Sequence, residues 1–136
     1  MHIDGACHCG FITYEANIDP EAVALCHCTD CQTLSGSAFR TVAFARREAF
    51  KLLTGQPKIY VKTAESGNKR AQAFCPECGT AIYAAAVTDT PAYGLRVGTI
   101  RQRAELPPKK QVWCRSALPW AQNLEAIRQF PKQPQA

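Results

Sequence analysis

The sequence "CHCG" at residues 7–10 has a counterpart far along the chain in "CPECG" at residues 75–79. Each stretch holds two cysteines, the second followed directly by glycine. In turns of this kind backbone N–H groups point at thiolate sulfur, and glycine tolerates the positive φ that the turn needs. Two such turns provide the four thiolates of a closed, tetrahedral zinc site that joins the N-terminus to the middle of the chain. The predicted ligands of this structural zinc are Cys7, Cys9, Cys75 and Cys78.

Other uses of the cysteines are less consistent with their spacing. The chain has eight cysteines, and an even number also allows a disulfide framework. Close C-x-C and C-x-x-C pairs favour a metal, because neighbouring thiols converge on one ion more readily than they bridge distant segments. A redox C-x-x-C at residues 75–78 is a further alternative, but the βαβ pattern that surrounds such motifs is missing.

Three more cysteines lie within "CHCTDC", residues 26–31. Their sulfurs can approach a metal from one side, and an open fourth position distinguishes a catalytic zinc from a structural one. The alternative is a second closed site, completed by His27 or by Cys114. The side chain of His27 is expected to point away from a metal shared by its neighbours, whereas Cys114 is distant but can fold back. We favour the open site, with Cys26, Cys28 and Cys31 as ligands of a second, catalytic zinc.

An open site of three thiolates indicates a particular chemistry. Three thiolates around Zn²⁺ leave one net negative charge, so the ion is a poor Lewis acid for activating water. It is better suited to an incoming thiol, whose pKa it lowers while the sulfur stays nucleophilic. The residues therefore predict thiol addition to an electrophilic carbon, or the reverse cleavage of a carbon–sulfur bond, with a small-molecule thiol as the fourth ligand.

The rest of the chain is typical of a small, mainly β protein. Its 136 residues suit one domain, which we assign to residues 1–130, with a flexible tail at 131–136. Five stretches alternate apolar with polar residues or are rich in β-branched and aromatic residues. These predicted strands are residues 11–18, 38–45, 58–64, 80–87 and 93–100.

One short C-terminal helix is expected in "LPWAQNLEAIRQF", residues 118–130. Pro119 suits the first turn of a helix. Four large apolar side chains would share one face of it, as in an amphipathic helix. They are Trp120, Leu124, Ile127 and Phe130.

Charge and hydropathy limit the partners. The formal net charge is +5, but the basic residues are scattered and form no long basic segment, so nucleic acid is not an expected partner. No apolar run approaches the roughly 20 residues of a membrane span. The opening "MHIDGACHCG" lacks the basic and apolar regions of a secretory signal. We expect a cytoplasmic protein without a membrane partner.

Several motifs together resemble one family. "GACHCG", "CHCTDCQTLSGSAF", "SGNKRAQAFCPECGTAIY", "RVGTI" and "ALPW" follow the order and spacing of the glutathione-dependent formaldehyde-activating enzyme family, which also includes centromere protein V. The resemblance spans roughly residues 5–120. It implies a two-sheet zinc-binding β fold related to zinc-binding Rab-exchange chaperones and methionine sulfoxide reductase B. It also implies one structural and one catalytic zinc on the cysteine groups named above.

The resemblance also supplies substrates that the residues alone do not. The family joins glutathione to formaldehyde as S-hydroxymethylglutathione, formally a carbon–sulfur lyase acting in reverse. For such an anionic tripeptide Arg40, Lys69 and Arg70 are reasonable carboxylate partners, although solvated surface charges are the more common role. His27 is expected to face solvent and Cys114 to be a buried apolar thiol. The competing hypotheses are a zinc-stabilised binding module without catalysis and a fold whose second zinc site has decayed.

Overall fold

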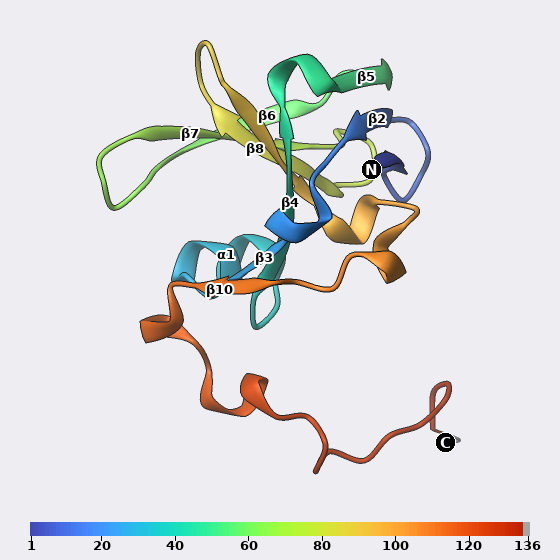
Figure 1. The fold of residues 1–136 in the computed structure, drawn as a ribbon, viewed down its shortest axis with the longest axis vertical. Helices are drawn as coiled ribbons and strands as arrows, with labels where there is room; N and C mark the ends of the chain where they lie inside the picture. Colours follow the sequence, from blue (N-terminus) through green and yellow to red (C-terminus); the bar gives the residue numbers. More distant parts are fainter. Residues whose placement is uncertain (135–136) are drawn as a thin grey trace.

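The chain folds into two mainly antiparallel β-sheets packed against each other (Figure 1). The computed structural model describes residues 1–134. One sheet has three strands in the order β1-β2-β5, and the other has seven in the order β10-β3-β4-β9-β8-β7-β6. Only β10 and β3 pair in parallel among the described strands. The prediction of a mainly β, two-sheet fold is confirmed.

The elements are short, as expected for a small β domain. The strands are β1 (His2–Ala6), β2 (Thr13–Asn17), β3 (Ala24–Cys26), β4 (Arg40–Arg46), β5 (Phe50–Thr54), β6 (Lys58–Thr63), β7 (Lys69–Phe74), β8 (Ala81–Ala86), β9 (Ala92–Arg96) and β10 (Lys110–Val112). Within residues 1–134 the one α-helix is α1 (Thr29–Ser35). The 3₁₀ turns are η1 (Pro20–Ala22), η2 (Arg47–Ala49), η3 (Val97–Thr99), η4 (Arg103–Glu105), η5 (Cys114–Ser116) and η6 (Pro119–Gln122).

All five strands predicted from the residue pattern are present. They correspond to β2, β4, β6, β8 and β9, each within or near the predicted limits. The remaining strands were not predicted, because β3 and β10 have three residues each and β1, β5 and β7 lack a clear alternation. A strand this short is defined by its neighbours in the sheet more than by its own composition.

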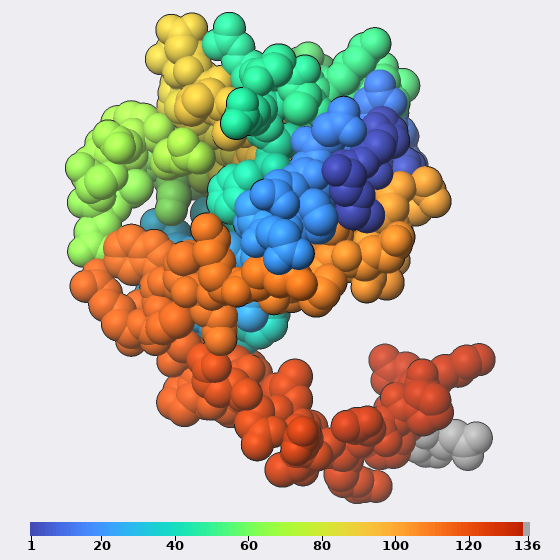
Figure 2. Space-filling model, in the orientation of Figure 1, coloured from blue at the N-terminus to red at the C-terminus, as the bar shows by residue number. Residues whose placement is uncertain are grey.

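The prediction of a C-terminal helix is wrong. The one helical element at residues 118–130 is the short 3₁₀ turn η6, and the chain there runs away from the sheets (Figures 1 and 2). The apolar side chains of the predicted face are 48–59% exposed, so no packing stabilises a helix that is marginal by itself. The flexible tail predicted for residues 131–136 includes 135 and 136, which lie outside the described residues. The single domain at 1–130 and that tail stay predictions.

The hydrophobic core lies between the two sheets. Its largest fully buried side chains come from both sheets and from the segment after β9. They include Ile3, Ile12, Tyr14, Ile82, Leu95, Ile100 and Leu106. Tyr14 is also anchored through its hydroxyl, which lies 2.6 Å from Thr99 Oγ1.

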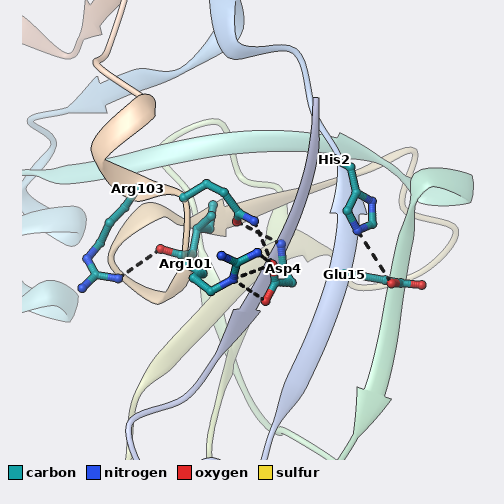
Figure 3. Close-up of polar contacts among 7 residues, drawn as sticks. His2, Asp4, Glu15, Arg101 and Arg103 are labelled. Atoms are coloured by element: carbon teal, nitrogen blue, oxygen red, sulfur yellow. Dashed lines mark hydrogen bonds and ion pairs between the residues drawn. The ribbon is translucent and has the colours of Figure 1, made fainter.

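A surface network fastens the first strand to the loop after β9 (Figure 3). Arg101 donates to both carboxylate oxygens of Asp4 over 2.8–3.1 Å, and Gln102 Nε2 donates to the same carboxylate over 2.8 Å. These hydrogen bonds from Arg101 and Gln102 hold the pKa of Asp4 below its usual value. Nearby, His2 Nε2 lies 3.9 Å from a carboxylate oxygen of Glu15 on β2. The network is exposed, so it defines the position of the loop more than it adds stability.

Among residues 1–134 the structure has no helix with the length and hydropathy that a membrane span requires.

Close packing at Gly5 gives a test of the core. A Cβ at Gly5 would overlap the ring of Tyr14 and lie 2.7 Å from the backbone oxygen of Thr99, which cannot move freely. We expect Gly5→Ala to lower the free energy of unfolding by about 2 kcal/mol or more, measured by urea denaturation. Gly98→Ala is the control, because its Cβ would meet nothing within 4 Å. Equal stability of the two variants would contradict this packing.

Candidate metal centres

Four cysteines from the two distant turns meet at one point, here called the four-cysteine centre. Their sulfurs all lie within 4.8 Å of one another. The sulfur of Cys9 is 3.6 Å from that of Cys7 and 3.8 Å from that of Cys75. Thiolates bound tetrahedrally at the usual Zn–S distance are about 3.8 Å apart. The donor set and its spacing fit zinc. The members are Cys7, Cys9, Cys75 and Cys78.

Both turns have the backbone geometry that the sequence predicted. Gly10 and Gly79 adopt φ values of 83° and 81°, and their N–H groups donate to the carbonyls of Cys7 and Cys75. The Ile12 N–H points at Cys7 Sγ over 3.2 Å, and the Glu77 N–H points at Cys75 Sγ over 3.4 Å. Donors aimed at sulfur stabilise the thiolate, which is the form that binds metal.

Thr80 links the two turns. The His8 N–H donates to Thr80 Oγ1 over 3.1 Å, from one turn to the other. The same hydroxyl lies 3.2 Å from Cys78 Sγ, and its hydrogen bond is the main reason why the pKa of Cys78 falls to about 5. Cys78 is therefore ready to bind a cation at neutral pH.

The other cluster, here called the three-cysteine centre, lies where β3 meets α1. Its sulfurs also lie within 4.8 Å of one another, and all three residues are half-buried. Cys26 ends β3, Cys28 is the N-cap of α1, and Cys31 is in its first turn. The Cys28 sulfur accepts the Cys31 N–H over 3.3 Å, so one capping interaction starts the helix and fixes two of the three sulfurs. Gly36 ends the helix in the left-handed conformation at φ 63°.

The thiol of Cys26 is unusually acidic. A hydrogen bond from the Cys31 thiol is the largest cause that lowers the pKa of Cys26 to about 5, and the positive charge of Arg40 contributes. The pKa of Cys31 is raised for the reciprocal reason. At neutral pH the cluster thus carries negative charge, as a metal site requires.

Neither residue proposed to close the three-cysteine centre joins it. His27 is buried at 1% exposed, and its Nε2 lies 2.7 Å from Gln111 Oε1 on β10. Its ring also packs edge-on against Phe39, so the expectation of a solvent-facing histidine is wrong. Cys114 is exposed, so the expectation of a buried thiol is also wrong. Among residues 1–134, therefore, three cysteines alone make up this ligand group.

The cysteines form no disulfide, although all eight lie in the described part of the chain. Their positions explain this result, because seven of them point into the two clusters and Cys114 is apart from both. The disulfide framework that an even count allows is not the structure adopted.

Two cavities lie at opposite ends of α1. One of about 350 Å³ is lined by Cys28 and by two ion pairs, Lys62–Asp30 and Arg115–Glu65, each with an N–O distance of 2.8–2.9 Å. The other, of about 340 Å³, lies near Leu34 at the far end of the helix. Both volumes are within the range of small-molecule sites.

Of the three basic residues considered as carboxylate partners, Arg40 alone lines the second cavity. Arg40 is buried at 7% exposed, so a solvated surface role is wrong for it, whereas Lys69 is exposed and Arg70 half-buried. Sequence reasoning missed Arg96 and Gln72, which are each 9% exposed and line this cavity. The signal for Arg96 was present, since it interrupts the apolar strand "YGLRVGTI".

Comparisons with known proteins agree with this architecture. A family model described as glutathione-dependent formaldehyde-activating enzyme matches residues 2–116. A crystal structure of a Rhodobacter sphaeroides protein is similar, with a TM-score of 0.62 and 18% sequence identity. The similarity covers 80% of this chain and 99% of that one. At this identity the second match supports the fold alone.

Loss of the four-cysteine centre is expected to affect stability more than loss of the other. Cys9→Ser should release about one zinc per chain and lower the free energy of unfolding by about 3 kcal/mol or more, because the centre joins segments 66 residues apart. Cys26→Ser should release zinc with a smaller loss, since its centre spans only residues 26–31. Metal content by mass spectrometry and urea unfolding measure both effects.

Cys114→Ser is the matched control, being an exposed cysteine outside both clusters. It should change neither metal content nor stability. A Cys9→Ser protein that keeps its full metal content and stability would contradict the four-cysteine centre.

Proposed function

The chain belongs to the glutathione-dependent formaldehyde-activating enzyme family, and on this premise we propose that it is a zinc-dependent carbon–sulfur lyase/synthase. The proposed reaction joins glutathione and formaldehyde as S-hydroxymethylglutathione and also runs in reverse. We assign catalysis to the three-cysteine centre and a structural role to the four-cysteine centre. We also propose a cytoplasmic location, because the cysteines are free thiols and thiols stay reduced in the cytoplasm.

One observation carries the catalytic assignment. The three-cysteine centre has three half-buried sulfurs within 4.8 Å, and neither His27 nor Cys114 reaches them. Three protein ligands are the number typical of catalytic zinc sites, whereas four are typical of structural ones. A zinc ion held there would lower the pKa of an incoming thiol and leave its sulfur nucleophilic.

The protein's own contribution is to bind and orient the reactants. The cavity beside Cys28 is lined by both cationic and anionic side chains, Lys62 with Asp30 and Arg115 with Glu65. A zwitterionic peptide such as glutathione carries both charges as well and can match them. Holding thiol and aldehyde together converts an encounter of two molecules into a reaction within one complex.

The chemistry balances without an oxidant or reductant. The glutathione sulfur attacks the carbonyl carbon of formaldehyde, and a carbon–sulfur bond forms. The electron pair of the carbonyl π bond moves to oxygen, which takes up one proton while the thiol gives up one. In the reverse direction the carbon–sulfur bond breaks and the hydroxyl loses its proton.

The direct test is exchange spectroscopy by NMR on a mixture of glutathione and formaldehyde. Added protein should accelerate the exchange between formaldehyde and S-hydroxymethylglutathione. Cys28→Ser, which removes one ligand of the three-cysteine centre, should reduce the protein-dependent rate about tenfold or more. Cys114→Ser should leave it unchanged.

Two outcomes would decide against this proposal. If the wild-type protein holds two zinc ions per chain and does not accelerate exchange, a zinc-stabilised binding module is the better interpretation. If Cys28→Ser retains the wild-type rate, catalysis does not take place at the three-cysteine centre.

A further inference from the structure

Two buried arginines face the cavity of about 340 Å³ beyond the C-terminal end of α1. Arg40 begins β4 and Arg96 ends β9, and their side chains are 7% and 9% exposed. Both also line an adjoining cavity of about 500 Å³. Leu34 and Tyr60 contribute apolar wall to the smaller cavity. Two cations thus lie in a sheltered site where electrostatic interactions are stronger than in water.

These guanidinium groups have too few partners for their burial. Arg40 Nη1 and Arg96 Nη2 donate to the same oxygen, Gln72 Oε1, over 3.3 and 3.0 Å. Arg96 Nε has no hydrogen-bond partner. In the part of the chain that the structure describes, the ion pairs involve neither arginine. Buried charge without a counter-ion is costly. Burial and the charge of Arg40 lower the pKa of Arg96 to about 9, and the opposing charges of Cys31 and Cys26 do not offset them.

The register of the large sheet places this pair beside the three-cysteine centre. Cys26 lies directly opposite Arg40, and Val42 lies directly opposite Arg96. Paired residues and residues two apart share one face of a sheet, so Cys26 and both arginines project from the same face. A ligand bound to the arginines would therefore lie on the face of the sheet that carries the Cys26 side chain, although none of the three cysteines lines the cavity itself.

The sulfurs cannot neutralise both arginines once a metal is bound. Three thiolates around a divalent ion keep only one negative charge, against two positive charges on Arg40 and Arg96. Arg70 on β7, which β8 separates from β9, adds further positive charge that also acts on Arg96. The site thus keeps an excess of positive charge beside the cavity.

We propose that Arg40 and Arg96 form a carboxylate-binding subsite for the thiol substrate. A carboxylate accepts parallel hydrogen bonds from guanidinium groups, and Gln72, which accepts from both arginines, holds them in one arrangement. The subsite selects thiols that carry a carboxylate a short distance from sulfur and disfavours neutral thiols. This inference rests on the proposed function, because it names the class of substrate for the same centre.

Calorimetric titration of the purified, metal-containing protein tests the subsite with three ligands. They are glutathione, S-methylglutathione with its thiol blocked, and glutathione dimethyl ester with both carboxylates blocked. Glutathione and S-methylglutathione should bind, and the dimethyl ester should bind about tenfold or more weakly than glutathione. Arg96→Met and Arg40→Met should each weaken binding of glutathione and S-methylglutathione about tenfold or more and change binding of the ester about twofold at most.

Arg46→Met is the control, since Arg46 is exposed at the other end of β4. It should leave all three affinities unchanged. If the arginine variants weakened binding of the ester and of glutathione equally, the arginines would serve only as counter-ions of the cysteines. That result would contradict the proposal. The proposal is also wrong if the wild-type protein binds the ester as tightly as glutathione or does not bind S-methylglutathione. The comparison of the three ligands uses wild-type protein, so it can still contradict the proposal if a variant fails to fold.

Failure of the subsite and failure of the proposed function give different results. If S-methylglutathione binds in an arginine-dependent way but the protein does not accelerate formaldehyde exchange, the result supports the subsite and contradicts the proposed reaction. If the protein accelerates exchange but binds glutathione and its dimethyl ester with equal affinity, the result supports the proposed reaction and contradicts the subsite.

Discussion

The convergence of four cysteine sulfurs is the constraint on which the rest of the structure depends. Cys7 and Cys9 follow β1 in the three-stranded sheet, while Cys75 and Cys78 lie between β7 and β8 of the seven-stranded sheet. The cluster therefore fastens one sheet to the other at the edge of the shared core. A chain of 136 residues can bury only a limited apolar area, so a cross-link of this kind adds stability that packing alone supplies less easily.

The same ligand type produces two different centres because the backbone differs. Two separate glycine-ended turns face each other and present four sulfurs, whereas a strand end and one helical turn present three from a single side. Residue His27 shows the difference directly, since β10 and Phe39 hold its ring away from the three sulfurs. Arg40 and Arg96 are buried on the sheet face that also carries Cys26.

The spacing of the cysteines was enough to predict the two cysteine groups and the positive-φ glycines beside them. The alternation of apolar and polar residues predicted five strands. Each of these features depends on residues close together in the sequence. Features that depend on distant partners were not predictable. The amphipathic pattern at 118–130 forms no helix, since nothing covers its apolar side, whereas the unremarked "TDCQTLS" forms α1 through the Cys28 cap. His27 and Arg40 are residue types usually found at the surface, and only the neighbouring strands explain their burial.

The central claim is that one cysteine cluster is closed and the other accepts an external thiol. X-ray absorption at the zinc edge, on protein of measured metal content, tests it most directly. We expect two zinc ions per chain that share seven protein sulfurs, and an average number of sulfurs per zinc that rises to about four when glutathione is added. A single zinc per chain, or four sulfurs around every zinc before any thiol is added, would contradict it.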